Sequence, residues 1–166
     1  ADNRYIALEN VNFKGNFTIG AWIRTGATNS QIIKFENIDG TKTFGVKVHN
    51  NKSKLVTQGA GLSNNWPGAI SKDLSTLGSQ WFHIVIVKNR NTIGFWINGT
   101  TDDDMHVTLP DSDTAALGNT RLRFFGSTAN PVYLADIRVF DYALSHVPAN
   151  GFGPRGSWSF IDDIKA

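Results

Sequence analysis

Residues Trp81–Gly99 read WFHIVIVKNRNTIGFWING, and this stretch carries most of the information about the fold. Trp81–Lys88 is apolar on both faces of an extended strand, which is typical of a central strand covered on both sides. Thr92–Ile97 follows after three polar residues, so the two segments are expected to form a β-hairpin. The dipeptides Asn98-Gly99 and Asp39-Gly40 predict further tight turns. The region indicates an antiparallel sheet with a buried centre.

The apolar residues elsewhere recur mostly with a period of two, which is the pattern of β-strands. No stretch of about ten residues or more has helical periodicity, and one short turn is expected at Ser145–Ala149. Gly59–Ser71 and Asp102–Leu117 are expected to be long loops. Further strands are predicted at Phe17–Ile23, Gln31–Phe35, Phe44–His49, Leu122–Phe125 and Val132–Phe140, with a closing strand at Ser157–Ile161.

The chain has 166 residues, of which 40% are hydrophobic and 18% are charged. That length is typical of one domain, so residues 1–166 are expected to form a single unit. Many strands separated by frequent turn residues indicate an all-β fold, an antiparallel β-sandwich of the jelly-roll type.

Composition and charge argue against several classes of partner. The formal net charge is +2, and the basic residues are scattered rather than gathered in a dense stripe, so no nucleic acid partner is expected. No apolar run approaches the roughly 18 residues of a membrane span, so no membrane insertion is expected. Cysteine is absent, which excludes a disulfide framework and thiolate metal ligands.

Three segments in order, Phe17–Ile23, Ser79–Gly99 and Tyr133–Ser145, together resemble a known family. They are similar to the laminin-G-like jelly rolls of the concanavalin A-like lectin and glucanase superfamily, and the similarity extends to about Ser145. The resemblance implies two stacked antiparallel sheets that bind ligands through one sheet or its loops. It also implies that Trp22 and Trp81 occupy framework positions in the core.

Catalysis is not expected from the acidic residues of this chain. Retaining glycosidases need two carboxylates about 5–5.5 Å apart, and the glucanases of the family place them on one strand as Glu-x-Asp-x-(x)-Glu. The chain has two glutamates, Glu9 and Glu36, in separate segments. The four histidines form no His-x-x-x-His pair, and His83 is expected to be structural, bonded across the sheet. We therefore predict that the protein is not an enzyme, with a glycosidase as the less favoured alternative.

Sugar binding needs an aromatic face for the apolar side of a pyranose, and amides or carboxylates for its hydroxyl groups. The alternatives are that Trp66 anchors its loop on the core, that Trp96 only packs on its sheet, and that the acidic run is a solvated turn. The predicted ligand-binding residues are Asn64, Asn65, Trp66, Trp96, Asp102, Asp103 and Asp104.

The family resemblance also implies a structural calcium ion. Members of the family often hold Ca²⁺ through an Asp before the strand that here reads Ile137–Phe140, assisted by oxygens from earlier segments. The corresponding residue is Asp136, and Glu9 and Gly40 are the predicted assisting ligands. The alternative is that Asp136 pairs with an arginine, either Arg138 or Arg4.

The sequence thus predicts a non-catalytic module that binds carbohydrate or a cell-surface receptor and serves adhesion within a larger extracellular or fibre protein. The expected partner is a cell-surface glycan or glycoprotein, and the expected location is extracellular or on a cell or virion surface. The alternative is a structural, oligomerising domain, which would be a homotrimer if the chain is part of a fibre.

Overall fold

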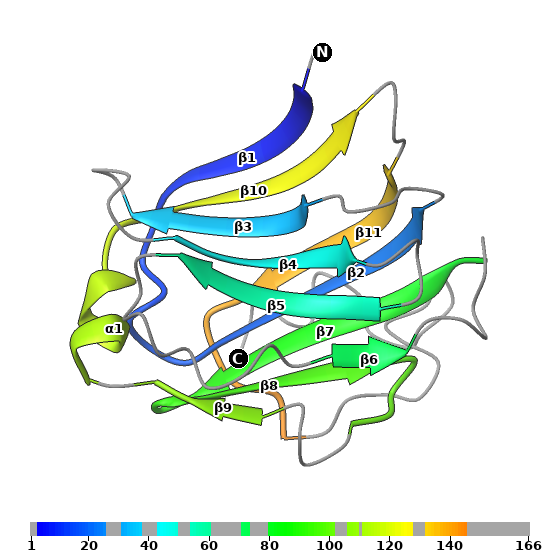
Figure 1. Ribbon diagram of the computed structural model, residues 1–166. Helices are drawn as coiled ribbons and strands as arrows, with labels where there is room; N and C mark the ends of the chain where they lie inside the picture. The colour runs from blue at the N-terminus through cyan, green and yellow to red at the C-terminus, as the bar shows by residue number, and fades with distance from the viewer. Residues whose placement is uncertain are drawn as a thin grey trace.

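The structure, a computed structural model, describes residues 3–25, 31–37, 43–49, 54–60, 71–73, 80–101, 106–109, 111–127 and 132–145. Within these residues, two antiparallel sheets stack on each other and a short helix lies at one end (Figure 1). The predicted antiparallel β-sandwich is confirmed. The strands are β1 (Asn3–Val11), β2 (Phe17–Thr25), β3 (Gln31–Asn37), β4 (Thr43–His49), β5 (Lys54–Ala60), β6 (Ser71–Asp73), β7 (Phe82–Asn89), β8 (Thr92–Ile97), β9 (His106–Thr108), β10 (Thr120–Ser127) and β11 (Val132–Phe140), and the helix is α1 (Asp111–Ala116).

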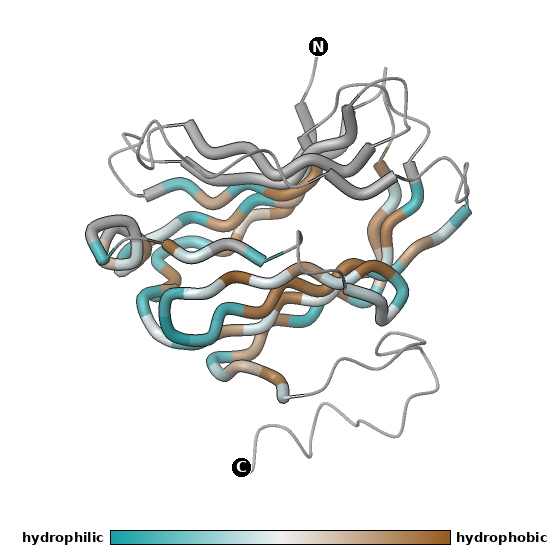
Figure 2. Tube along the Cα trace, turned by 60° about the horizontal axis from the view of Figure 1, so that its bottom comes forward, coloured by the Kyte–Doolittle hydropathy of each residue, from teal (hydrophilic) through white to brown (hydrophobic). Residues whose placement is uncertain are grey.

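The six-stranded sheet has the order β1-β10-β3-β4-β5-β6, and the five-stranded sheet has the order β11-β2-β7-β8-β9. Alternation of side chains sends every second residue of each strand between the sheets. Figure 2 shows apolar residues along those strands of the two layers that are coloured by hydropathy. The main core includes Phe17, Ile19, Ala21 and Ile23 from β2, Ile84 and Ile86 from β7, Phe95 and Ile97 from β8, Phe35 from β3 and Phe124 from β10.

β7 is buried on both faces, as its apolar sequence predicts. All residues from Phe82 to Lys88 are buried. Its inward side chains join the main core, whereas Val85 and Val87 point away from the six-stranded sheet, on what we call the outer face. There they form a second, smaller apolar cluster with Trp96, Phe140, Ala143 and Leu144.

The segment Asp141–Ser145, which we call the strap, covers part of this outer face after β11 ends. Its anchor is the buried Thr18 of β2, whose hydroxyl donates to the carbonyl of Tyr142 at 2.8 Å. The same hydroxyl accepts from the backbone N–H of Leu144 at 3.0 Å. One threonine therefore holds the strap over the outer face.

The two predicted turns of the central hairpin region are confirmed. Asn89 pairs with Thr92, so a two-residue turn joins β7 to β8, and Arg90 in that turn has φ of 54°. Asn98 and Gly99 have φ of 51° and 74°, the positive values that a type I′ turn requires. The predicted turn at Asp39-Gly40 lies outside the described residues.

The long loop predicted at Asp102–Leu117 is wrong in part, because it contains β9 and α1. Both elements are too short for periodicity to indicate them: β9 has 3 residues and α1 has 6. The prediction also omitted β1, β5 and β6. The turn predicted at Ser145–Ala149 and the closing strand predicted at Ser157–Ile161 fall beyond the described part of the chain. Among described residues, no helix has the length and apolar character to cross a membrane.

Lys88 is a buried cation at the end of β7, only 1% exposed. Its Nζ donates to the carbonyls of Lys14 and Gly15 at 2.8 and 2.9 Å. Burial lowers the pKa of Lys88. The amine therefore stabilises the connection between β1 and β2 by satisfying two backbone acceptors.

We expect Lys88→Met to lower the free energy of unfolding by about 1–3 kcal/mol, because it leaves two carbonyls without their donor. Urea unfolding measures the change. Lys14→Met is the matched control, since the Lys14 side chain is exposed and its loss removes one positive charge in the same way. Equal stability of the two variants would contradict the anchoring role of Lys88.

Candidate functional site

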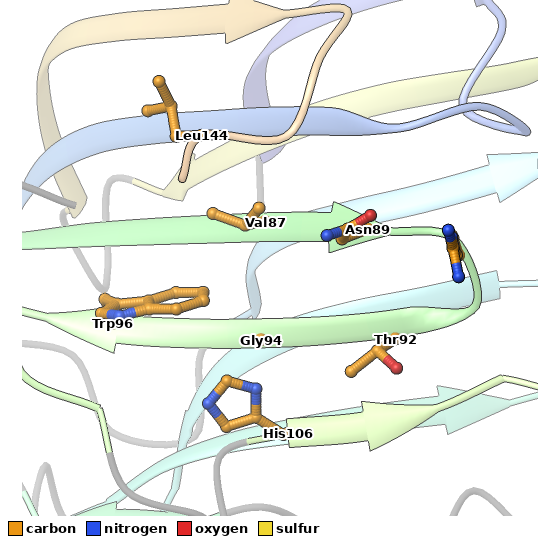
Figure 3. A pocket seen from close by; sticks show the side chains of 8 residues that line it. Val87, Asn89, Thr92, Gly94, Trp96, His106 and Leu144 are labelled. Atoms are coloured by element: carbon orange, nitrogen blue, oxygen red, sulfur yellow. The ribbon is translucent and has the colours of Figure 1, made fainter. Parts of the chain in front are cut away.

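An open groove lies on the outer face of the five-stranded sheet, with a volume of about 500 Å³. We call it the Trp96 groove (Figure 3). β7 and β8 form its floor, β9 one wall and the strap the other, and the turn between β7 and β8 lies at one end. It is lined by Val87, Asn89, Arg90, Thr92, Gly94, Trp96, His106 and Leu144.

The indole of Trp96 lies over Gly94 of the same strand. A Cβ atom at position 94 would lie 2.6 Å from Cη2 of Trp96 and 2.8 Å from Cε1 of His106. These separations are shorter than van der Waals contact, so any larger residue at position 94 would displace a ring. Gly94 therefore allows both rings to rest close to the sheet backbone.

His106 of β9 lies beside Trp96 (Figure 3), with ring centroids 5.3 Å apart and planes at 82°. Such an edge-to-face arrangement is favourable for aromatic rings. Nε2 of His106 is also 3.1 Å from the hydroxyl of Thr101. Trp96 also packs against the cluster of Val85 and Val87 on β7. The indole is thus held in place before any ligand arrives.

Polar groups lie at the turn end of the groove. Asn89 and Arg90 are exposed, and Thr92 is half-buried. The backbone N–H of Arg90 donates to Oδ1 of Asn16 at 2.7 Å, which fixes the turn against the loop before β2. The groove therefore combines an aromatic surface with an amide, a hydroxyl, a guanidinium and an imidazole.

None of the groove's lining residues is a carboxylate, so the described part of the chain offers no pair of acids at this place. Four carboxylates described elsewhere have partners of their own. Glu9 pairs with Arg121, Glu36 with Lys34 and Arg123, Asp136 with Arg138, and Asp111 accepts from Asn91.

Of the predicted ligand-binding residues, only Trp96 lies within the described part of the chain. It lines the groove. Its neighbours Phe95 and Ile97 are buried whereas Trp96 is half-buried, so the predicted alternation is confirmed. His106 and Gly94 were not predicted as site residues; the isolated glycine within β8 is the signal that could have indicated a close approach. The other predicted residues, Asn64, Asn65, Trp66, Asp102, Asp103 and Asp104, lie outside the described residues.

The predicted calcium ligands do not come together in the described residues. Nε of Arg138 donates to Oδ1 of Asp136 at 2.8 Å, which is the pairing that the sequence left as the alternative. Glu9 is on the other sheet and pairs with Arg121. No group of three or more acidic, histidine or cysteine side chains suited to a metal occurs among the described residues. Gly40 is not among them, so calcium stays a prediction.

Asp136 is nevertheless in an unusual environment. It has φ of 49° at an irregularity in the pairing of β11 with β2, and its Oδ2 is buried without a hydrogen-bond donor among the described residues. Its negative charge also acts on His83, where it partly offsets the lowering of the pKa that burial causes. The carboxylate is thus part of a buried polar cluster with His83 and Arg138.

His83 is the centre of that cluster. It is fully buried and its ring faces Trp22 across the sheet, with centroids 5.2 Å apart. Burial lowers the pKa of His83 to about 4, although the charge of Asp136 opposes the shift. The imidazole is therefore neutral at pH 7. Its complete burial fits a structural role, whereas the bond across the sheet stays a prediction.

Trp81 is not in the core, so its predicted framework position is wrong. It is 40% exposed and directly precedes β7. Its ring lies under the guanidinium of Arg24, whose Cζ is 5.3 Å from the ring centroid. Trp22, the other predicted core tryptophan, is half-buried.

Comparison with known families agrees with this fold. A laminin-G family model, described as the concanavalin A-like lectin/glucanases superfamily, matches residues 1–147, and the chain belongs to that family. The predicted resemblance and jelly-roll class are confirmed. Comparison with curated proteins finds no match.

Several solved structures are similar in fold. One is of botulinum neurotoxin type C, whose cell entry is described as dependent on two ganglioside molecules (14% identity, TM-score 0.59, covering 85% of this chain and 37% of that chain). Another is the binding domain of botulinum neurotoxin DC in complex with rat synaptotagmin II (18% identity, TM-score 0.56, 85% and 37% covered). A third is mouse laminin alpha1 chain, domains LG4-5 (13% identity, TM-score 0.57, 85% and 40% covered). This chain spans less than half of each, and at such identities the likeness shows the fold alone.

The lowered pKa of His83 predicts a pH dependence of stability. The folded pKa of about 4 lies below the ordinary value of 6.5, so the unfolded chain binds more protons between these values. Stability should therefore be fully present above pH 6.5 and decline as the pH falls to 4, by on the order of 3 kcal/mol.

Urea unfolding at several pH values, on the wild type and on His83→Gln, tests this prediction. The variant lacks the titrating group, so its stability should depend less on pH across that window. His106 is common to both proteins and cancels in the comparison. Parallel pH profiles for the two proteins would refute the assignment to His83.

The calcium prediction has a separate test. If Asp136 holds a structural calcium ion, EDTA lowers the melting midpoint and added calcium restores it, whereas the midpoint of Asp136→Asn responds to neither. If EDTA leaves the melting midpoint of the wild type unchanged, the calcium prediction is wrong.

Proposed function

We propose that this domain binds carbohydrate without catalysis, through the Trp96 groove, as a recognition module of a larger extracellular or fibre protein. The observation that carries the proposal is the indole of Trp96, which rests on Gly94 beside His106 in an open groove with polar groups at its end. The expected partner is a glycan or glycoprotein on a cell surface.

A sugar ring has an apolar C–H face and a polar edge of hydroxyl groups, so it needs both kinds of contact. Trp96 offers an apolar surface that loses little entropy on binding, because neighbouring side chains already hold it. Asn89, Thr92 and His106 can donate to or accept from hydroxyl groups. The volume of about 500 Å³ is within the usual range for sites that bind small molecules.

The absence of catalysis is part of the proposal. Glycoside hydrolysis needs an acid and a nucleophile or base on either side of the scissile bond, and the described lining of the groove has no carboxylate. Two proteins of similar fold support a surface receptor as the kind of partner: cell entry of botulinum neurotoxin type C depends on gangliosides, and the binding domain of botulinum neurotoxin DC forms a complex with rat synaptotagmin II.

A glycan array followed by calorimetry on the best neutral oligosaccharide tests the proposal. We expect Trp96→Ala to weaken binding at least tenfold, which corresponds to about 1.4 kcal/mol, because the variant removes the stacking surface. Ile6→Ala is a control, because Ile6 is an exposed apolar residue on the other sheet. Absence of any bound glycan, or undiminished binding by a folded Trp96→Ala, would overturn the proposal.

Gly94→Ala is a sharper variant in the same titration, because it removes no group that can contact a ligand. Its added methyl group meets Trp96 and His106, so the rings shift and affinity should fall. Gly15→Ala is the matched control, since a Cβ atom there has no neighbour within 4 Å. Unchanged affinity in Gly94→Ala would argue that the ring positions are unimportant for binding.

A further inference from the structure

A second aromatic cluster lies on the outer face of the same sheet, away from the Trp96 groove. Arg24 of β2 pairs in register with Tyr133 of β11, and Trp81 precedes β7, the strand on the other side of β2. The guanidinium carbon of Arg24 is 4.4 Å from the ring centroid of Tyr133 and 5.3 Å from that of Trp81. We call these three residues the Arg24 cluster.

The two rings of the Arg24 cluster are unusually exposed. Trp81 is 40% exposed and Tyr133 is 47% exposed, which places both among the few exposed large hydrophobic residues of the described chain. Aromatic residues that gather on a surface commonly mark an interaction site. Neither ring is needed to fill the main core.

The charge of Arg24 has no carboxylate partner among the described residues, whereas Arg121, Arg123 and Arg138 each pair with an acid. Its guanidinium lies instead over the rings of Trp81 and Tyr133. Cation–π contacts of this kind orient the guanidinium and leave its in-plane N–H groups available. The cluster therefore presents a positioned positive charge between two apolar surfaces.

We propose that the Arg24 cluster binds the carboxylate of an acidic sugar, such as a uronic acid residue of an oligosaccharide. The planar guanidinium matches a carboxylate through two parallel hydrogen bonds, and Trp81 and Tyr133 offer apolar surface to the sugar ring. A single arginine fits one carboxylate, whereas a densely sulfated chain calls for several cations. The choice of a saccharide rests on the proposed function, but the site uses residues outside the Trp96 groove.

An oligouronate and its methyl ester form the test pair, because esterification removes the charge and keeps the sugar rings. Calorimetry on the whole domain should show that the wild type binds the oligouronate at least tenfold more tightly than the methyl ester. Arg24→Gln should bind both equally weakly, and Arg24→Lys, which keeps the charge but loses the planar fork, should fall between. A sulfated, uronate-free oligosaccharide should bind more weakly than the oligouronate.

Lys14→Gln is the matched control, because it removes one exposed positive charge at a distance from the cluster and should leave oligouronate binding unchanged. Far-ultraviolet spectra and melting midpoints verify that each variant folds. An equal loss in Lys14→Gln and Arg24→Gln, equal affinity for acid and ester, or tighter binding of the sulfated ligand would each overturn the inference.

Trp96→Ala separates this inference from the proposed function. If oligouronate binding depends on Arg24 while Trp96→Ala binds neutral sugars normally, the inference about the Arg24 cluster is supported and the proposed role of the Trp96 groove is wrong. If Trp96→Ala abolishes neutral sugar binding and Arg24→Gln leaves the oligouronate affinity unchanged, the groove stands and the Arg24 inference fails.

Discussion

β7 has to be covered on both of its faces, and the rest of the described structure follows from this constraint. Apolar side chains alternate to both sides of the strand, so one sheet alone leaves half of them in water. The six-stranded sheet covers the inner side. On the outer side, the strap and Trp96 cover Val85 and Val87. The groove is the space that this partial cover leaves between Leu144 and His106.

The two surfaces proposed for ligands share one rigid support. Arg24 and Trp96 both point to the outer face of the five-stranded sheet, on strands separated only by β7. Gly20 of β2 pairs with Val85 of β7, which in turn pairs with Trp96 of β8. Arg24 lies further along β2 than Gly20, so it is displaced from Trp96 by about 13 Å along the strand direction. Because hydrogen-bonded strands hold both surfaces, their spacing is fixed and suits an extended ligand better than a compact one.

Sequence periodicity predicted the local features well and the long-range ones poorly. Alternation placed Trp96 on the opposite face from its neighbours, and Asn98-Gly99 indicated its turn, because both signals lie within a few residues. The exposure of Trp81 depends on where β7 enters the sheet, and the contact of Arg24 with Tyr133 depends on strand register. Neither the exposure of Trp81 nor the contact of Arg24 with Tyr133 can be predicted from the neighbouring residues in the sequence. Much of the predicted site, including Trp66, lies in segments that the structure does not describe.

The strap also has a consequence for how the molecule reaches its native state. The hydroxyl of Thr18 contacts Tyr142 and Leu144, which are 124 and 126 positions further along the chain. Contacts of such long range close large loops, and all-β proteins dominated by them fold over milliseconds to seconds rather than microseconds. The wall of the groove that the strap provides therefore depends on bringing together two segments that are far apart in the sequence, so it should be among the later parts of the domain to form.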